Sequence, residues 1–490
     1  MSGARTEISN RKWSDAELQA ARREVLAKWP TGAEVNLREA FAYHRNMPSE
    51  KNMAVVMQRG KKDGRTLVQP RVGFPTVEEH AAALRYVQEQ SGCDIVPTQP
   101  DTYTRYYRFE DVRKGLEDSI KSGQSKLNGY PIVNHGVYNT RRVVEAVKVP
   151  LELRFAAPDI RFCAEIALAS GYTAFTAGAI GNVLCFSKRM TPEDGMLINQ
   201  YADRLAAHYS EEGGVPVYRE LTAYLTGTLV PPSVCNSAMI LEALLAAAQG
   251  VKFVCPGFLQ GGNLIQDVAA VRVLAKLTAE YLQKLGYEGV DVSTVFHEWL
   301  SAFPPDMARA FAVICWGAAT AVLAGANMVI AKSPEEFHGV PTKEMNAAGA
   351  RASKQTVDML WRQRLAMSAE LETEMEIIEV ETRAIVDRVI ELGQGDLAFG
   401  VIRGIKSGVI DIPWAPNLHN AGLVVPVRDH DGRIRYLSHG NLPLPKDVID
   451  FHRERIAARG KAEGREPGYE MLVDDVQAVP QGRLLGMPTM

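Results

Sequence analysis

Three arginines and one asparagine follow short apolar runs, each near the point where the run ends. Arg71 follows TLVQP, Arg105 follows CDIVPTQPDTYT, Asn128 follows SKL, and Arg154 follows PLEL. Short apolar runs that stop at proline or polar residues are typical of buried strands. If these strands are parallel neighbours, their carboxyl ends lie on one face and the four side chains converge there. Arginine binds carboxylates and phosphates bidentately and stays charged away from water, so the pattern indicates a site for an anionic ligand of either kind.

Signatures of several other catalytic classes are missing from the chain. It has no GxGxxG after a strand, no GxxxxGK[ST], no HExxH and no GxSxG. His297 in VFHEW follows an apolar run, but the ten histidines do not cluster at the spacing of metal ligands. We therefore interpret His297 and His338 as hydrogen-bonded structural histidines, and we expect no metal ligands in this chain.

Composition and charge narrow the function classes. The 490 residues include 55 Lys and Arg against 58 Asp and Glu, a net charge of -3, so no basic excess is available to hold a nucleic acid. Six cysteines are scattered without a CxxC pair, which is typical of a reducing cytoplasm and suggests neither a disulfide framework nor structural zinc. The polar N-terminal stretch MSGARTEISNRKW has no apolar core of an export signal. We expect a cytoplasmic protein.

Strand and helix patterns alternate through the first two thirds of the chain. This alternation predicts a parallel sheet, and the number of units favours closure into a barrel. The sequence contains nine strand candidates, whereas a barrel of this kind has eight strands, so one candidate is peripheral or is not a strand. The candidates are residues 66–69, 93–97, 125–129, 151–155, 171–176, 215–220, 252–256, 291–297 and 328–332.

One apolar stretch, residues 311–330, is about as long as a membrane span. It contains Gly317, Gly325 and Asn327, and its flanks lack a bias towards Lys and Arg. Its last residues have the composition of a strand. We therefore predict a buried helix followed by a buried strand, as an α/β barrel requires, and no membrane partner.

Outside the barrel, strand and helix patterns no longer alternate. Ser14 and Glu17 have the spacing of a capping box for a first helix, and residues 342–362 and 368–392 predict two long helices. VVPVRDHDGRIRYL predicts a hairpin that turns at Asp431 and Gly432. We divide the chain into an N-terminal helical segment (1–60), a barrel (61–340), long helices packed on it (341–410) and a C-terminal α+β extension with a hairpin and terminal helix (411–490).

Seven sequence runs, in order, carry a resemblance to a known family. They are QPRVG, YTR, LNGYPIVNHG, LTGTLVPPS, GNLIQD, TVFHEW and PTKEMNAAG. With them the chain, from about residue 13 to residue 486, resembles the catalytic (epsilon) subunit of adenosylcobalamin-dependent glutamate mutase, also called methylaspartate mutase. The resemblance implies an α/β fold, a TIM-type (β/α)8 barrel whose mouth is covered by cobalamin on a separate small subunit. This chain has no cobalamin-ligating DxHxxG motif, so the partner should supply one.

The resemblance also implies an activity and an assembly. The activity is an isomerase reaction in which a radical from the cofactor abstracts hydrogen, the substrate radical fragments and recombines, and hydrogen returns. A barrel that excludes water protects such radicals. The assembly is a dimer of these large chains flanked by two small subunits, a heterotetramer.

Individual positions carry over from the family to this chain. Arg71, Arg105 and Arg154 match the arginines that bind the carboxylates of a small dicarboxylate substrate. Lys332 and Glu336 would hold the adenosyl ribose, with Lys332 also assigned a catalytic role. The positions implied to contact the cofactor are Gly73, Asn128, Cys185, Phe303, Lys332, Glu336 and Val340.

The chain departs from the family at the substrate's ammonium. The segment TAFTAGAIGNVLCF places Thr176 where the family has a catalytic, ammonium-binding Glu, and Asn182 and Phe186 where it has two Tyr. Phe155 replaces a His that follows the third arginine. A buried ammonium without its carboxylate would cost several kcal/mol, so either another acid replaces the Glu or the substrate lacks the ammonium.

Three hypotheses follow from these departures. The first is a mutase that interconverts glutamate, or a close dicarboxylate, and its branched 3-methylaspartate-type isomer. The second keeps this chemistry but acts on a non-amino diacid such as a 2-hydroxy diacid, whose hydroxyl Thr176 and Asn182 could hydrogen-bond. The third is a non-catalytic paralogue that acts as a binding partner. Retention of the three arginines with Lys332 and Glu336 counts against the third hypothesis.

Overall fold

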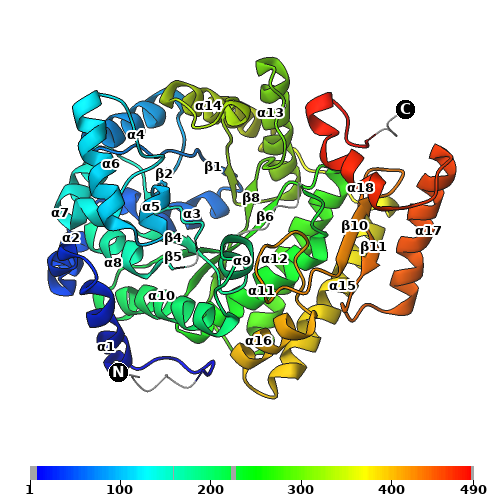
Figure 1. The fold of residues 1–490 in the computed structure, drawn as a ribbon, viewed down its shortest axis with the longest axis horizontal. Helices are drawn as coiled ribbons and strands as arrows, with labels where there is room; N and C mark the ends of the chain where they lie inside the picture. Colours follow the sequence, from blue (N-terminus) through cyan, green and yellow to red (C-terminus); the bar gives the residue numbers. More distant parts are fainter. Residues whose placement is uncertain (1–7, 158, 222–227, 487–490) are drawn as a thin grey trace.

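The computed structural model describes residues 8–157, 159–221 and 228–486. Its centre is a parallel sheet of eight strands in the order β1-β9-β8-β6-β5-β4-β3-β2, surrounded by helices (Figure 1). The strands are β1 (Leu67–Gln69), β2 (Val96–Thr98), β3 (Leu151–Leu153), β4 (Ala174–Ala177), β5 (Tyr218–Leu221), β6 (Phe253–Leu259), β8 (Val295–His297) and β9 (Met328–Ile330).

The two ends of this sheet meet between β1 and β2. The Asp94 amide donates to the Val68 carbonyl at 3.0 Å, and the Gln99 amide donates to the Val72 carbonyl at 2.9 Å. These bonds bring the first strand beside the second and nearly close the sheet. The structure therefore confirms the predicted (β/α)8 barrel, in which parallel strands are buried on both sides.

Comparison with the nine strand candidates identifies the one that is wrong. Residues 125–129 form no strand, and β2 pairs directly with β3, for example Val96 with Leu151. Because these neighbours already share their hydrogen bonds, no place remains between them for a further strand. The candidate at residues 291–297 is divided into the two-residue β7 (Asp291–Val292) and β8, which both pair with β6.

Most of the helices alternate with the strands and cover the barrel. The capping box predicted at Ser14 and Glu17 is present at the start of the first helix. The helices are α1 (Asp15–Leu26), α2 (Leu37–Arg45), α3 (Met53–Lys62), α4 (Val77–Ser91), α5 (Thr102–Arg105), α6 (Phe109–Ser122), α7 (Ile132–Glu145), α8 (Arg161–Ser170), α9 (Gly181–Phe186), α10 (Pro192–Gly213), α11 (Pro232–Ala248), α12 (Leu264–Lys284), α13 (Met307–Ala324), α14 (Lys343–Leu360), α15 (Ala369–Gly393), α16 (Leu397–Ser407), α17 (Lys446–Glu463) and α18 (Tyr469–Val476).

Helix α13 contains most of the apolar stretch that resembles a membrane span. It is the one described helix that is long and apolar enough to cross a membrane, and half of its residues are buried inside the protein. Strand β9 follows it, as predicted for a buried helix and strand. Its apolar composition is therefore accounted for by packing against the barrel.

The chain after the barrel packs on one side of it. The long helix α15 packs against α11 and α12, which is why α11 is buried almost throughout. Beyond it, the predicted hairpin forms from β10 (Val424–Arg428) and β11 (Ile434–His439), with α17 and α18 beside it (Figure 1). The division of the chain at residues 60, 340 and 410 stays a prediction.

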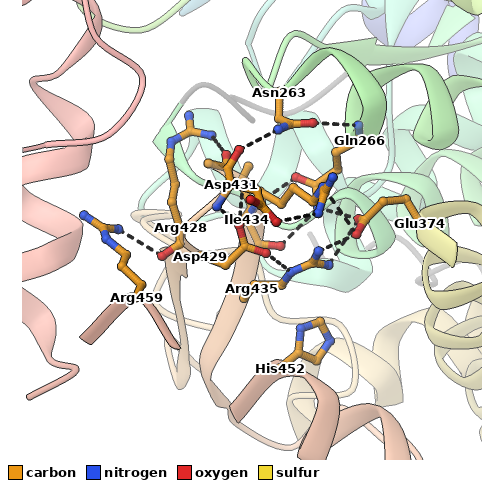
Figure 2. Close-up of polar contacts among 12 residues, drawn as sticks. Asn263, Gln266, Glu374, Arg428, Asp429, Asp431, Ile434, Arg435, His452 and Arg459 are labelled. Carbon is orange, nitrogen blue, oxygen red and sulfur yellow. Dashed lines mark hydrogen bonds and ion pairs between the residues drawn. The ribbon is translucent and has the colours of Figure 1, made fainter. Parts of the chain in front are cut away.

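Buried charges join this hairpin to the barrel helices (Figure 2). Arg435 is 1% exposed and bonds to Asp429 at 2.7 Å and to Glu374 of α15. The amide of Ile434 donates to the Gln266 side chain of α12 at 2.8 Å. Because each buried charge has a partner of opposite sign, removal of one partner would leave an uncompensated buried charge.

Candidate active site

A cavity opens at the carboxyl ends of the barrel strands. The predicted site residues that line it are Arg71, Arg105, Arg154, Phe155, Thr176, Phe186 and Lys332. The other lining residues are Gln99, Ala156, Leu259, His297, Glu298, Leu300 and Ile330. The structure thus gathers three arginines and one lysine, which come from loops and strand ends far apart in the sequence.

Arg71 lies in the loop after β1, and Arg105 is the last residue of the short helix α5 that follows β2. With the Gln99 amide oriented to satisfy its hydrogen bonds, its oxygen accepts from Arg71 Nε at 3.0 Å and Nη2 at 2.9 Å. Arg105 Nε donates to the Pro100 carbonyl at 2.8 Å. Burial, together with repulsion from other cations, lowers the pKa of both guanidinium groups. A bound anion would relieve this cost.

Arg154, just after β3, is held from below by three side chains. Its Nη1 donates to Gln69 Oε1 at 2.9 Å, to Glu220 Oε2 at 2.7 Å and to Glu152 Oε2 at 3.3 Å. Glu220 Oε1 in turn lies 3.3 Å from His297 Nε2. These contacts fix the position of the guanidinium inside the barrel.

Gln69, Glu152, Glu220 and His297 come from β1, β3, β5 and β8, which are alternate strands around the barrel. Side chains from alternate strands form the interior layers of such barrels. No role was predicted from the sequence for Gln69, Glu152 or Glu220. The sequence did contain a signal for the two acids. Glu152 and Glu220 lie within apolar strand candidates, and a charged side chain in a buried strand needs a partner.

The wall at Thr176 and Phe155 differs from the cationic side of the cavity. The Phe155 amide donates to Thr176 Oγ1 at 2.5 Å, and Oγ1 donates to the Phe155 carbonyl at 3.1 Å. The Thr176 hydroxyl therefore has no donor left for a ligand and can offer one lone pair. Asn182 does not line the cavity. Its Nδ2 donates to the Ala157 carbonyl at 3.0 Å.

Lys332 and Glu336 form an ion pair at the edge of the cavity. Lys332 Nζ lies 2.7 Å from Glu336 Oε2, and Arg71 Nη1 lies 3.9 Å from the same oxygen. Lys332 is 3% exposed, and burial with the charge of Arg71 lowers its pKa to about 7. An ammonium and a carboxylate placed together in this way can both hydrogen-bond the hydroxyls of a sugar.

The remaining positions implied to contact the cofactor do not line the cavity. Val340 is exposed beyond η4 (Glu336–His338), Cys185 is half-buried in α9, and Phe303 is buried against Trp299. Asn128 lies in a loop, where its side chain bonds to Thr102, for example from the Thr102 amide at 2.9 Å.

Gly73 has a structural reason to be glycine. A Cβ there would lie 2.7 Å from the Gln99 carbonyl oxygen. The absence of a side chain allows the loops after β1 and β2 to approach each other, as expected where two backbones pack closely. This approach brings Arg71 and Gln99 together.

The histidines that the sequence singled out lie in different surroundings. His297 lines the cavity and contacts Glu220, whereas His338 ends η4. Within residues 8–157, 159–221 and 228–486, no three His, Cys, Asp or Glu side chains are grouped to hold a metal ion. The motif LTGTLVPPS begins with residues 225–227, which lie outside the described residues.

The barrel and its cavity define a (β/α)8 enzyme with a cationic pocket suited to an anionic ligand. A family model described as "Methylaspartate mutase E chain (MutE)" matches residues 47–488, and the chain belongs to this family. It is therefore an isomerase of the mutase type.

Three relatives are similar over nearly their full length. The glutamate mutase epsilon subunit of Desulfitobacterium hafniense is 47% identical over 482 residues, 98% of this chain and 99% of the relative. The same-named proteins of Treponema denticola and Yersinia enterocolitica are 46% identical over 479 residues and 45% identical over 483 residues. These cover 98% of this chain and 99% and 100% of the relatives.

Among solved structures, tryptophan synthase subunit alpha from Legionella pneumophila matches at a TM-score of 0.34 and 11% identity. The match covers 62% of this chain and 97% of that chain. The similarity is low, and the assignment of the barrel rests on the strand pairing described above.

Proposed function

We propose that this chain is the catalytic subunit of an adenosylcobalamin-dependent carbon-skeleton mutase. It would interconvert glutamate, or a close dicarboxylate, and its branched 3-methylaspartate-type isomer. The observation that carries the proposal is the convergence of Arg71, Arg105 and Arg154 on one cavity. Two carboxylates bound by three guanidinium groups would be held in a fixed orientation, as a rearrangement between two similar skeletons requires.

The residues at the cavity edge fit the proposed cofactor. Lys332 and Glu336 would hold the ribose hydroxyls of the adenosyl group, since the lysine nitrogen donates hydrogen bonds, the carboxylate accepts them, and the two lie 2.7 Å apart. When bound, adenosylcobalamin supplies a carbon radical by homolysis of its cobalt–carbon bond. In this proposal the arginines orient the substrate, and the apolar side chains of Phe155, Phe186 and Ile330 exclude water from the reacting atoms.

A partner that covers the barrel mouth is supported by the surface around it. Exposed apolar side chains follow several strands at their carboxyl ends. They are Tyr103 and Tyr106 after β2, Met307 after β8, and Phe337 and Val340 after β9. Such a rim is suited to an interface. We propose a small cobalamin-binding subunit there, in a cytoplasmic heterotetramer.

A second candidate substrate is favoured by the wall at Thr176. Among the described residues that line the cavity, only Glu298 is acidic, and burial raises its pKa to about 8. At pH 7 it is mostly neutral, so a substrate ammonium would lack a charged partner. A 2-hydroxy diacid avoids this cost, and Thr176 Oγ1 could accept its hydroxyl hydrogen. Family membership and the retained arginines argue against a non-catalytic paralogue.

The test is reconstitution of the full chain with a cobalamin-binding small subunit and adenosylcobalamin. Glutamate and 2-hydroxyglutarate are supplied in turn, products are followed by NMR, and the radical by EPR. Formation of a branched isomer from either diacid supports the mutase proposal and identifies its substrate class. Absence of a radical and of product with both diacids, in a complex shown to hold the cofactor, would refute the proposal.

A further inference from the structure

The contacts of Arg154 all involve one edge of its guanidinium. Among the described residues, its side-chain hydrogen bonds leave from Nη1, towards Gln69, Glu152 and Glu220. Gln69 also donates from Nε2 to Glu152 Oε2 at 2.7 Å. The side chain of Arg154 lines the cavity. The rest of the guanidinium therefore stays available to a ligand carboxylate, which it can bind through two parallel N–H groups.

The charges beneath Arg154 do not balance if both acids are ionised. Glu152 and Glu220 are fully buried and both approach the same guanidinium nitrogen. Glu152 Oε1 has no hydrogen-bond partner among the described residues. Two carboxylates in a dry site with one cation between them cannot both hold a negative charge without a large desolvation cost. One proton on the pair removes this imbalance.

We propose that Glu152 and Glu220 are positioning residues that hold Arg154 as a carboxyl–carboxylate pair with one shared proton. The pair and Arg154 are then neutral together, and the free edge of the guanidinium meets a substrate carboxylate without an opposing charge behind it. Ionisation of the second acid would put a negative charge beneath the substrate and weaken its binding. This inference rests on the proposed function of the cavity as a dicarboxylate site.

The groups around the pair agree with this assignment. Burial and the charge of Glu220 raise the pKa of Glu152 to about 8, whereas the charge of Arg154 overcomes burial and lowers that of Glu220 to about 2. Burial lowers the pKa of His297, which leaves it neutral beside Glu220. Burial raises the pKa of Cys255 on β6, so this thiol adds no charge.

No other charge from the adjacent strands faces Glu152. Its register partners are Pro97 on β2 and Ala174 on β4, which do not titrate. Arg71 also acts on His297, and Lys332 and Glu298 line the same cavity. Because Lys332 and Glu298 titrate near pH 7 and pH 8, they would also change ligand binding at alkaline pH. The test must therefore compare two chains across pH, so that these shared contributions cancel.

The experiment measures the Kd of glutarate, a dicarboxylate without a third substituent, for the full chain by calorimetry. The parent and Glu152→Gln are compared, because Gln retains the acceptor for Gln69 and Arg154 but cannot ionise. We expect equal Kd values at about pH 6.5, and at about pH 9.5 a Kd about fivefold lower in the variant. A purely structural role of Glu152 would change Kd by the same factor at both pH values.

Glu220→Gln provides an independent second comparison. With Glu220 neutral, Arg154 would hold Glu152 as the single carboxylate over the whole pH range. The extra loss of glutarate binding that the parent shows at alkaline pH should again be absent in this variant. For each variant, the Kd is divided by the Kd of the parent at the same pH. If this ratio is the same at both pH values in either variant, the proposal of a shared proton is wrong. If the parent does not bind glutarate at any pH, the dicarboxylate site itself is wrong and both proposals fall.

Discussion

Thr176 and Phe155 hold each other through two hydrogen bonds, one in each direction, across the ends of the neighbouring strands β4 and β3. The Phe155 amide donates to Thr176 Oγ1 and this hydroxyl donates to the Phe155 carbonyl. The pair forms a neutral part of the cavity wall. The sequence predicts that this chain differs from the glutamate mutase pattern at Thr176, so we expect this wall to affect which substrate the enzyme accepts.

Thr176→Glu should raise kcat/KM for glutamate if the parent is built for a neutral substituent. The new carboxylate would pair with the substrate ammonium, which has no ionised partner in the parent at pH 7. The same change should lower activity on 2-hydroxyglutarate, because an unpaired carboxylate would be buried beside it. The measurement is kcat/KM for both diacids in the reconstituted complex. High parental activity on glutamate that falls in the variant would contradict this.

Arg154→Lys should lower kcat/KM by roughly a hundredfold, because an ammonium cannot bind a carboxylate bidentately and hold Gln69 and Glu220 at once. Steady-state kinetics of the reconstituted complex measures the loss. The matched control is Arg142→Lys, since Arg142 is exposed and pairs with Glu78 on the outside of the barrel. Equal loss in both variants, or none in Arg154→Lys, would remove Arg154 from the site.

Lys332→Ala should abolish most radical formation while the chain stays folded. The variant loses the ammonium that pairs with Glu336 and would hold the adenosyl ribose. EPR of the complex with substrate, normalised to bound cofactor, measures the radical, and circular dichroism monitors the fold. Lys343→Ala, at a half-buried position at the start of α14, is the control. An EPR signal equal to that of the parent would show that Lys332 has no such role.

Glu298→Gln should become more stable relative to the parent as pH rises. The folded-state pKa of Glu298 is about 8, above the ordinary 4.5, so the folded chain holds a proton that the unfolded chain releases. The parent therefore loses stability from this group between about pH 4.5 and about pH 8, on the order of 5 kcal/mol. Gln can still accept from the Lys332 amide and contact Ser353.

Urea unfolding of the Glu298→Gln variant at both ends of this pH range measures the difference. The control is the exposed Glu454→Gln in α17, for which the difference from the parent should not change with pH. A constant difference for Glu298→Gln as well would mean that Glu298 is ionised in the folded chain.

Arg435→Leu should destabilise the docking of the C-terminal hairpin by about 3 to 5 kcal/mol, because the buried Asp429 would lose its arginine partner and Glu374 would keep only Arg433 at 3.6 Å. Thermal unfolding by circular dichroism measures the loss. Arg453→Leu removes an exposed pair with Asp450 and should change stability by less than about 1 kcal/mol. Similar melting of the two variants would show that the buried network contributes little.

The sequence by itself predicted the barrel and the arginines of its cavity. Alternating strand and helix patterns are local features, and arginines at strand ends must share a face once parallel strands close. The same logic failed at residues 125–129, where a short run that ends in the turn residues Asn128 and Gly129 looks like the end of a strand. Only the direct pairing of β2 with β3 excludes it, and strand pairing joins residues far apart in the chain.

The tertiary structure alone decided what surrounds each charge. No spacing in the sequence brings Gln69, Glu152 and Glu220 to one nitrogen of Arg154, because they come from three different strands. Nor does it reveal that the Thr176 hydroxyl is already bonded to Phe155, or that Asn182 lies outside the cavity lining. Side-chain type is a property of the sequence, whereas hydrogen-bond partners and burial, which determine protonation and specificity, depend on closure of the barrel.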